Sequence, residues 1–273
     1  METKKLLSFF PILLICLAIF MLNITFAGKI SGTILMIIRI VLIALFFTAW
    51  QLFKRKKQIH AKNLAFIFMV INLAFFIVSF FTIELWNLNL NSAKGIALMK
   101  FSDGFIISFV LIGSFLIGGY KLNDIFISRG RLTLGLSIGF LTFILFGLYA
   151  LLSSKQPIES AFISKNLGWI LLFIFSNAFM EELLFRGIFI KALNNFFKPV
   201  WTIILTAIVF AAAHLQVTYT PDVLFLALIV LILGVIWGLL IHYTKSIIAS
   251  VLFHAGGDLL IIVPTYLSLA GNG

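Results

Sequence analysis

Residues 167–190 read LGWILLFIFSNAFMEELLFRGIFI, an apolar run that nevertheless carries three charged side chains, Glu181, Glu182 and Arg186. About 20 apolar residues are enough for a helix to span a bilayer core. An ionised side chain at that depth costs roughly 2.5 to 3.5 kcal/mol on insertion scales, so such groups usually face a cavity or a partner. The run therefore predicts both a transmembrane helix and a functional site within it.

The composition of the whole chain is that of a polytopic membrane protein. Its 273 residues are 62% hydrophobic and 11% charged, with 32 Phe and a mean hydropathy of +1.19. These values exclude a water-soluble globule of this length. The formal net charge is +11, but the basic residues punctuate apolar runs and form no long tract. We interpret them as anchors facing anionic lipid and expect no nucleic-acid partner. Cys16 is the only cysteine, which excludes an intrachain disulfide and a Cys-based zinc site.

Nine apolar runs follow one another and predict an all-α fold, a polytopic transmembrane helical bundle of about eight to nine helices. They lie near residues 6–24, 33–53, 64–83, 104–120, 132–152, 167–190, 200–214, 223–242 and 247–267. Lys4 and Lys5 before the first run are similar to the start of a signal peptide. The length of the segment and the poor cleavage site at residues 26–28 favour a retained first helix.

The distribution of Lys and Arg predicts the orientation of these helices. When the loops are assigned alternately to the two sides, 14 of the 20 basic residues, with the Lys54–Lys57 loop among them, fall on one side and five on the other. The positive-inside rule then places the N-terminus in the cytoplasm and the C-terminus outside, in a multi-pass protein of the cell membrane. Arg39 lies inside a span, and we expect its long side chain to reach the membrane interface.

No internal repeat, linker or soluble domain divides the chain. We interpret residues 1–130 as N-terminal transmembrane helices without motifs and residues 131–267 as the core, because the polar motifs described next all lie within residues 160–267. Two small-xxx-small pairs predict places where helix backbones approach closely. They are Gly135 with Gly139 and Gly234 with Gly238.

Three polar motifs break the apolar pattern, each on a helix of its own. They are Glu181-Glu182-x-x-x-Arg186, Phe210-x-x-x-His214 and His254-x-x-x-Asp258. Glu182 and Arg186 are four residues apart and share a helix face, so each lowers the cost of keeping the other charged. Glu181 is rotated by roughly 100° on the helical period, which leaves its carboxylate free for chemistry. Asn177 lies one turn before Glu181 on the same face and could donate a hydrogen bond to it.

The three motifs can meet in one cavity. At ~1.5 Å of rise per residue, Glu181 lies roughly 8 to 15 Å from the cytoplasmic end of its span, His254 about 13 Å and His214 about 20 Å. A carboxylate and two imidazoles can activate a water for attack on an amide, by general base catalysis or through a metal bound by these three side chains. The chain has no HExxH helix, which excludes the zincin arrangement. Each motif taken alone is explained equally well by hydrogen bonding between helices.

The ordered set EExxxR, FxxxH and Hxxx(N/D) on successive hydrophobic helices resembles the CPBP group of intramembrane proteases. This group includes the CAAX prenyl endopeptidases, the bacterial abortive-infection (ABI) proteins and the bacteriocin-processing or immunity proteins. The resemblance covers roughly residues 160–267. It implies an all-helical endopeptidase, surrounded by membrane lipids, that hydrolyses a peptide bond of a membrane-associated protein or peptide with a hydrophobic or lipidated part.

The resemblance also implies roles for the motif residues. Glu181 would activate water together with His214, while His254 and Asp258 would support the oxyanion or complete the site. Three further residues would support these four. They are Glu182, Arg186 and Phe210. Family members are described as metalloproteases, so the resemblance implies either a divalent metal such as zinc on Glu181, His214 and His254, or a glutamate that works without metal.

Asp258 departs from the family pattern, because many members have Asn there. An amide can donate to an oxyanion and an ionised Asp cannot, so Asp258 is either protonated, a metal ligand or an orienter of His254. The alternative function is a non-catalytic immunity or regulatory protein that binds a bacteriocin or a membrane partner. A small transporter is less well supported, because we find no inverted repeat and no broken pair of helices.

Overall fold

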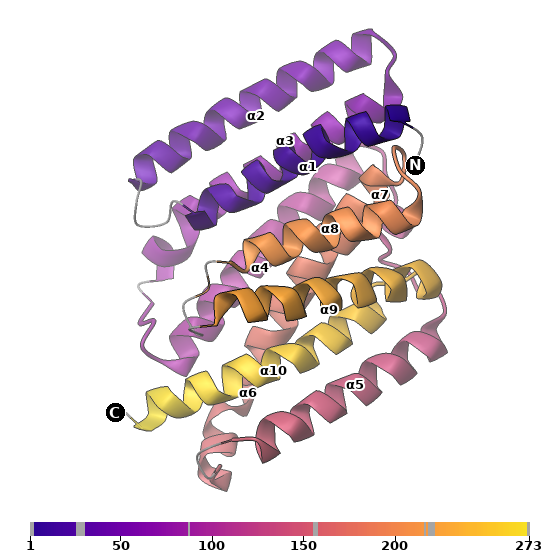
Figure 1. The fold of residues 1–273 in the computed structure, drawn as a ribbon. Helices are drawn as coiled ribbons and strands as arrows, with labels where there is room; N and C mark the ends of the chain where they lie inside the picture. Colours follow the sequence, from indigo (N-terminus) through magenta and orange to yellow (C-terminus); the bar gives the residue numbers. More distant parts are fainter. Residues whose placement is uncertain are drawn as a thin grey trace.

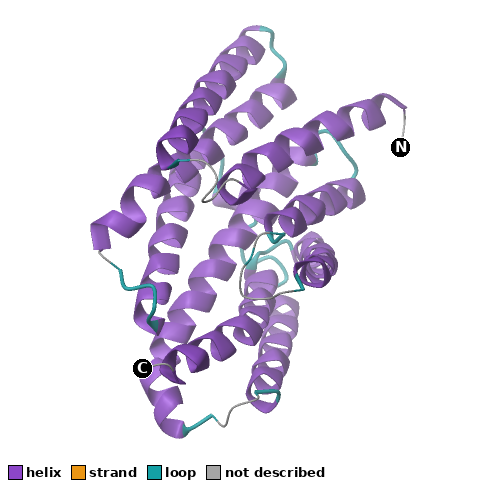
Figure 2. Cartoon of the chain, turned by 60° about the vertical axis from the view of Figure 1, so that its left-hand side comes forward, coloured by secondary structure: helices purple, strands orange, loops and turns teal. Residues whose placement is uncertain are grey.

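The computed structural model describes residues 3–25, 31–86, 88–154, 158–215, 217 and 222–271, and this part of the chain contains helices and no strand. Figures 1 and 2 show the bundle from two sides. The α-helices are α1 (Thr3–Thr25), α2 (Gly32–Arg55), α3 (Ile59–Trp86), α4 (Ala93–Ile117), α5 (Leu132–Leu152), α6 (Ser160–Glu181), α7 (Ile190–Leu193), α8 (Pro199–Ala213), α9 (Val223–Thr244) and α10 (Ile248–Gly271). A 3₁₀ turn, η1 (Leu122–Ile125), precedes α5, and a π-helix, η2 (Glu182–Phe189), joins α6 to α7.

The predicted all-α transmembrane bundle is confirmed. Each of the nine apolar runs coincides with a helical segment among the described residues. Seven of these segments are long and apolar enough to cross a membrane, and the longest runs without a break from Ser160 to Leu193. Two are shorter, Ser8–Leu22 and Pro199–Ala213. The short α8 ends at Ala213 and His214 caps it, which places the second motif at the end of a helix and not in its middle.

The start of α4 differs from the prediction, which began this span at residue 104. The helix begins at Ala93, because the side chain of Ser92 accepts a hydrogen bond from the backbone N–H of Gly95 at 3.1 Å and caps the first turn. Lys100 lowers the hydropathy of this first part of the helix, so hydropathy alone misses it. Lys100 therefore lies within a span and not in the loop before it.

The helices pack in an order that brings the motif helices together. In Figure 1, α2 lies along one edge of the bundle, packed on α3, and α5 lies along the opposite edge, packed on α10. Between them, α6 packs against α4 and α10, and α8 packs against α1 and α9. The helices before residue 130 are thus in direct contact with those that carry motifs. The division into 1–130 and 131–267 stays a prediction.

Both small-xxx-small pairs lie at close helix contacts, as predicted. On α5, a Cβ added at Gly139 would approach the Leu252 side chain of α10 to 2.7 Å. On α9, a Cβ added at Gly234 would lie 3.2 Å from Ala207 Cβ of α8. At these positions a larger side chain would push the helices apart.

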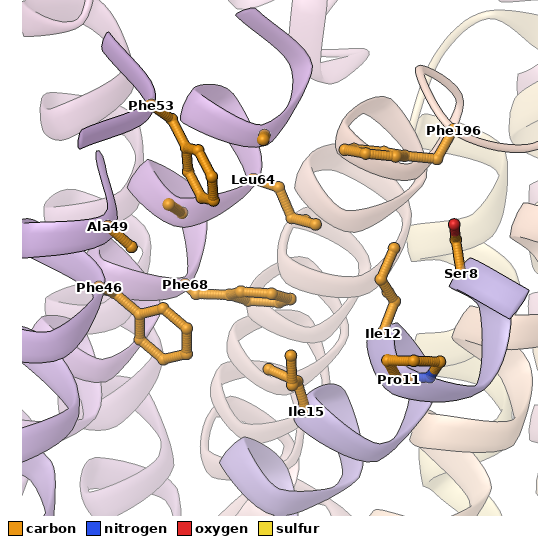
Figure 3. Close-up of a pocket in the computed structure, with 12 residues that line it drawn as sticks. Ser8, Pro11, Ile12, Ile15, Phe46, Ala49, Phe53, Leu64, Phe68 and Phe196 are labelled. Atoms are coloured by element: carbon orange, nitrogen blue, oxygen red, sulfur yellow. The ribbon is translucent and has the colours of Figure 1, made fainter. Parts of the chain in front are cut away.

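Arg39 does not reach the membrane interface, so that expectation was wrong. It is buried, with 2% of its surface exposed. Its guanidinium donates to Asn72 Oδ1 at 2.6 Å and to the backbone oxygen of Ile19 at 2.9 Å. These bonds tie α2 to α3 and α1, because Asn72 lies on α3 and Ile19 lies on α1. An apolar groove of about 400 Å³ also lies between α1, α2 and α3, with Phe196 at one end (Figure 3).

Candidate active site

The first motif lies where the helix changes its winding. Glu181 is the last residue of α6, and Glu182 is the first of the π-helix η2. The expectation of one regular α-helix over residues 167–190 was therefore incomplete. All eight residues of η2 are buried. Wider π turns of this kind are frequently found at functional sites, because they change the direction in which side chains point.

Glu182 and Arg186 form the predicted pair at the centre of the site. Arg186 Nη1 donates to Glu182 Oε1 at 3.0 Å, and neither side chain has any exposed surface. Arg186 Nε and Nη2 have no hydrogen-bond partner within the described residues. Aromatic faces surround the cation instead, with the ring centroid of Phe210 at 4.2 Å and that of Trp237 at 5.1 Å. Cation–π attraction then replaces part of the lost hydration.

His254 is held in a single orientation by two neighbours. Its Nδ1 lies 2.9 Å from Glu182 Oε1. Because a carboxylate oxygen accepts, Nδ1 carries the proton of this bond. The imidazole also stacks on the Trp237 indole, with centroids 4.2 Å apart and planes 10° from parallel. Glu182 therefore fixes the tautomer of His254 and turns Nε2 toward the rest of the site.

Two carboxylates face His254 Nε2. Glu181 Oε2 lies 3.5 Å from it and Asp258 Oδ1 lies 3.6 Å from it. A proton is needed at this contact, because an imidazole lone pair would otherwise face the lone pairs of two carboxylates. Asp258 Oδ2 also accepts a hydrogen bond from Asn177 Nδ2 at 3.0 Å. Asn177 thus binds Asp258, and not Glu181 as its helix position suggested.

His214 approaches the site from the end of α8. Its Nδ1 lies 2.9 Å from the backbone oxygen of Phe210, and the Phe210 ring packs against the imidazole with centroids 4.6 Å apart. A carbonyl oxygen only accepts, so Nδ1 carries a proton in this bond. In the neutral imidazole Nε2 then has a free lone pair that can accept a hydrogen bond from water. Phe210 therefore positions His214 and also lines the Arg186 cation.

A cavity of about 320 Å³ joins the three motifs. Glu181, His214 and Asp258 line it, together with Asn177 and Lys100. Glu181 Oε2 has no hydrogen-bond partner there, and 15% of the Glu181 side-chain surface is exposed, against none for Glu182. The sequence-predicted site residues thus come together, with Glu181 on the cavity wall and Glu182 behind it.

The arrangement of the same residues decides whether they could hold a metal ion. In the described part of the chain, no three His, Cys, Asp or Glu side chains are arranged so that they could hold a metal ion. His254 Nδ1 donates to Glu182, and Nε2 is the ring nitrogen that faces Glu181. As arranged, Glu181, His214 and His254 do not fit a metal, and we derive no step through one.

Comparison with known protein families found a match that covers the motif helices. Residues 163–260 match the model of a protein family described as type II CAAX prenyl endopeptidase, Rce1-like. The resemblance inferred from the motifs is confirmed over this segment. The matched segment contains all three motifs. At family level it supports an intramembrane CAAX-type protease, and with the apolar helices it indicates a multi-pass membrane protein. No match was found among the curated proteins or the solved structures.

Two contributors to this candidate site were missed by reasoning from the sequence. Trp237 lies in a uniformly apolar helix, and nothing in its spacing distinguishes it from a core residue. Lys100 was placed in a loop because of its charge. The signal that could have found Lys100 was the capping serine at Ser92, which moves the start of α4 to include it.

Proposed function

We propose that this protein is an intramembrane endopeptidase that hydrolyses a peptide bond of a membrane-associated, hydrophobic or lipidated protein or peptide. The observation that carries the proposal is the Glu181 carboxylate, whose Oε2 accepts no hydrogen bond and which lies on the wall of a cavity that His214 and Asp258 also line. A buried carboxylate oxygen without a partner is costly unless it serves a bound group. The Rce1-like match over residues 163–260 supports the same reaction class.

The reaction starts with a water between Glu181 and His214. Glu181 accepts one proton of this water, and Nε2 of neutral His214 accepts a hydrogen bond from the other hydrogen. The water oxygen forms a bond to the carbonyl carbon of the scissile peptide, whose oxygen becomes an oxyanion. The C–N bond then breaks, and the proton held by Glu181 passes to the leaving nitrogen. The products are a carboxyl group and an amine.

His254 and Asp258 act beside Glu181, because His254 Nε2 lies 3.5 Å from Glu181 Oε2. The proton that their contact with Glu181 requires is available as a hydrogen-bond donor to the oxyanion. An ionised Asp cannot donate to an oxyanion as the Asn of many family members can. In this role the donated proton belongs to the pair of His254 and Asp258, so no amide is needed. Glu182, Trp237 and Arg186 are positioning residues, since they act on the reaction through the orientation of His254.

The decisive experiment compares Glu181→Gln with a matched control. Gln preserves the shape of the side chain but cannot accept a proton, so cleavage of a fluorogenic peptide with a lipidated end should fall to background. The control is Glu159→Gln, the same change at an exposed residue whose side chain makes no capping hydrogen bond at the start of α6. It should cleave like the wild type. If Glu181→Gln cleaves equally well, the residues serve binding, and the immunity or regulatory function becomes the better account.

Residues that act as one unit are non-additive in rate. The double variant Glu181→Gln with His254→Ala should therefore be little worse than either single variant. Independent contributions would instead multiply. A chelator tests the involvement of metal separately: loss of activity that zinc restores would establish a metalloprotease, and survival of activity would establish catalysis by Glu181 without metal.

For localisation, the proposal is a multi-pass protein of the cell membrane with its N-terminus in the cytoplasm and its C-terminus outside. The support is the excess of Lys and Arg on one side of the predicted spans, including the loop at Lys54–Lys57. Membrane lipids and a membrane-associated substrate are the proposed partners.

A further inference from the structure

Lys100 places a cation on the wall of the candidate active site. It is the eighth residue of α4 and lies inside a helix long and apolar enough to cross a membrane. Its side chain lines the same cavity as Glu181, His214 and Asp258. A lysine at such depth is costly, so a functional partner is the default interpretation.

Among the described residues, Lys100 makes no direct contact with an acid. Throughout the described part of the chain, its ammonium forms no ion pair, hydrogen bond or ring contact. The two acids that line the cavity with it, Glu181 and Asp258, face His254 instead, at 3.5 and 3.6 Å from its Nε2. Glu182 and Arg186, the other charged pair of the site, bind each other. Lys100 is thus the cation of this cavity that is available to an incoming group.

The chemistry of Lys100 determines what that group is. An ammonium offers three donors and a point charge, and no acceptor. A carboxylate is the substrate group that an ammonium binds best, because charge-assisted hydrogen bonds are about twice as strong as neutral ones. A peptide supplies a carboxylate either at its C-terminus or from an Asp or Glu side chain.

The size of the cavity limits where this carboxylate lies. Its volume of about 320 Å³ is near the lower end of the range for ligand pockets, roughly 300 to 1,000 Å³. Such a cavity accommodates only a short segment of peptide. A carboxylate that reaches Lys100 while the scissile bond lies at Glu181 must therefore be within a few residues of that bond.

We propose that Lys100 is a specificity-determining residue that binds a substrate carboxylate close to the scissile peptide bond. This inference rests on the proposed function, because it assigns a substrate feature to the same site. It predicts that the preferred substrate is cleaved near a negative charge, even though the surrounding cavity wall is mostly apolar.

The experiment uses three lipidated hydrophobic peptides with the same sequence. One ends in a free carboxylate, the second ends in an amide, and the third ends in an amide but has a Glu beside the scissile bond. The wild type should prefer a carboxylate-bearing peptide over the plain amide by roughly 10- to 100-fold in kcat/KM, mainly through KM. Whether the first or the third peptide is preferred identifies the source of the carboxylate.

Lys100→Met removes the charge, keeps an unbranched side chain and introduces an apolar residue into a span. It should abolish the preference by raising KM for the carboxylate peptides, whereas Lys100→Arg should keep part of it. Lys94→Met is the matched control, since Lys94 is on the same helix but lies over the Trp169 ring, outside the residues that line the cavity. It should keep the full preference.

Two results would overturn the inference. One is a wild type that does not distinguish the three peptides. The other is a Lys100→Met variant whose kcat falls equally for all of them, which would assign Lys100 to the transition state. Binding of fluorescent versions of the peptides separates this inference from the proposed function. A carboxylate preference in binding that depends on Lys100 would support the subsite even if no peptide is cleaved, and binding without that preference would overturn it.

Discussion

Replacing Arg186 by Leu should destabilise the protein strongly. The change leaves the Glu182 carboxylate buried, with His254 as its one remaining partner among the described residues. At the observed separation of 3.0 Å and an effective dielectric constant of about 20, Coulomb's law assigns roughly 5.5 kcal/mol to the lost attraction. Breaking buried pairs by removing one partner costs about 3 to 5 kcal/mol. Because His254 still donates to Glu182, we expect the lower part of that range, on the order of a 100-fold change in the folding equilibrium.

The assay measures membrane abundance by immunoblot and thermal unfolding of the purified protein in detergent. Lys191→Met is the matched control, because Lys191 and Asp124 form an ion pair of similar length, 3.2 Å, with 41% and 37% of their side-chain surfaces exposed. Solvent screens such a pair, and its loss should cost at most about 1 kcal/mol. Arg186→Leu should therefore lower abundance and unfolding temperature far more than the control.

A second variant distinguishes the cause. Adding Glu182→Gln to Arg186→Leu removes the uncompensated charge, so stability should recover in part, while activity should stay low because His254 loses its carboxylate partner. Our reasoning is refuted if Arg186→Leu is as stable and abundant as the wild type. If that stable variant is also inactive, Arg186 takes part directly in the reaction.

Three further predictions concern orientation, pH and packing. A cysteine at Lys56 should not react with an impermeant reagent added from outside, and labelling there would reverse the proposed orientation. The Lys121 backbone N–H, more than any other group, lowers the pKa of Asp124 below its ordinary value of 3.8. As the pH falls, the unfolded chain therefore binds a proton at Asp124 before the folded chain does. The contribution of Asp124 to folding stability, which is present above pH 3.8, is lost as the pH falls through the lower pKa of the folded state. Asp124→Asn should flatten this loss in thermal unfolding between about pH 5 and about pH 2, and an unchanged pH profile would contradict it. Gly234→Ala should destabilise by roughly 1 to 3 kcal/mol, because the new Cβ would lie 3.0 Å from the guanidinium of the buried pair. Gly168→Ala, where no atom lies within 4 Å of the added Cβ, should be neutral in the same assay.

Hydropathy predicted the positions of the helices well, but it predicted their boundaries and the placement of charged side chains less well. Nine apolar runs predicted nine helical segments among the described residues, because the cost of exposing backbone polar groups to lipid leaves few alternatives. Hydropathy did not predict the first part of α4, because Lys100 lowers the mean hydropathy there. It also failed at Arg39, because a buried arginine is tolerated where another helix supplies acceptors, here Asn72 and Ile19.

Helical periodicity was similarly reliable for contacts within one helix. The pairing of Glu182 with Arg186 follows from a spacing of four residues, and so does the short separation of His254 from Asp258. Helical periodicity did not predict contacts between helices. Helix period places Asn177 on the same face as Glu181, but in the structure Asn177 donates to Asp258 of α10.

The amino-acid sequence by itself determined the membrane class, the positions of the spans and the three motifs, because hydropathy and helical period are local properties of the chain. Only the tertiary structure decided that Glu182 binds His254 Nδ1, that Trp237 stacks on the same imidazole and that Lys100 shares a cavity with Glu181. These contacts depend on how far each helix is rotated and shifted against its neighbours. Close-packed side chains and glycine contacts set that rotation jointly across several helices, so no single segment contains the information.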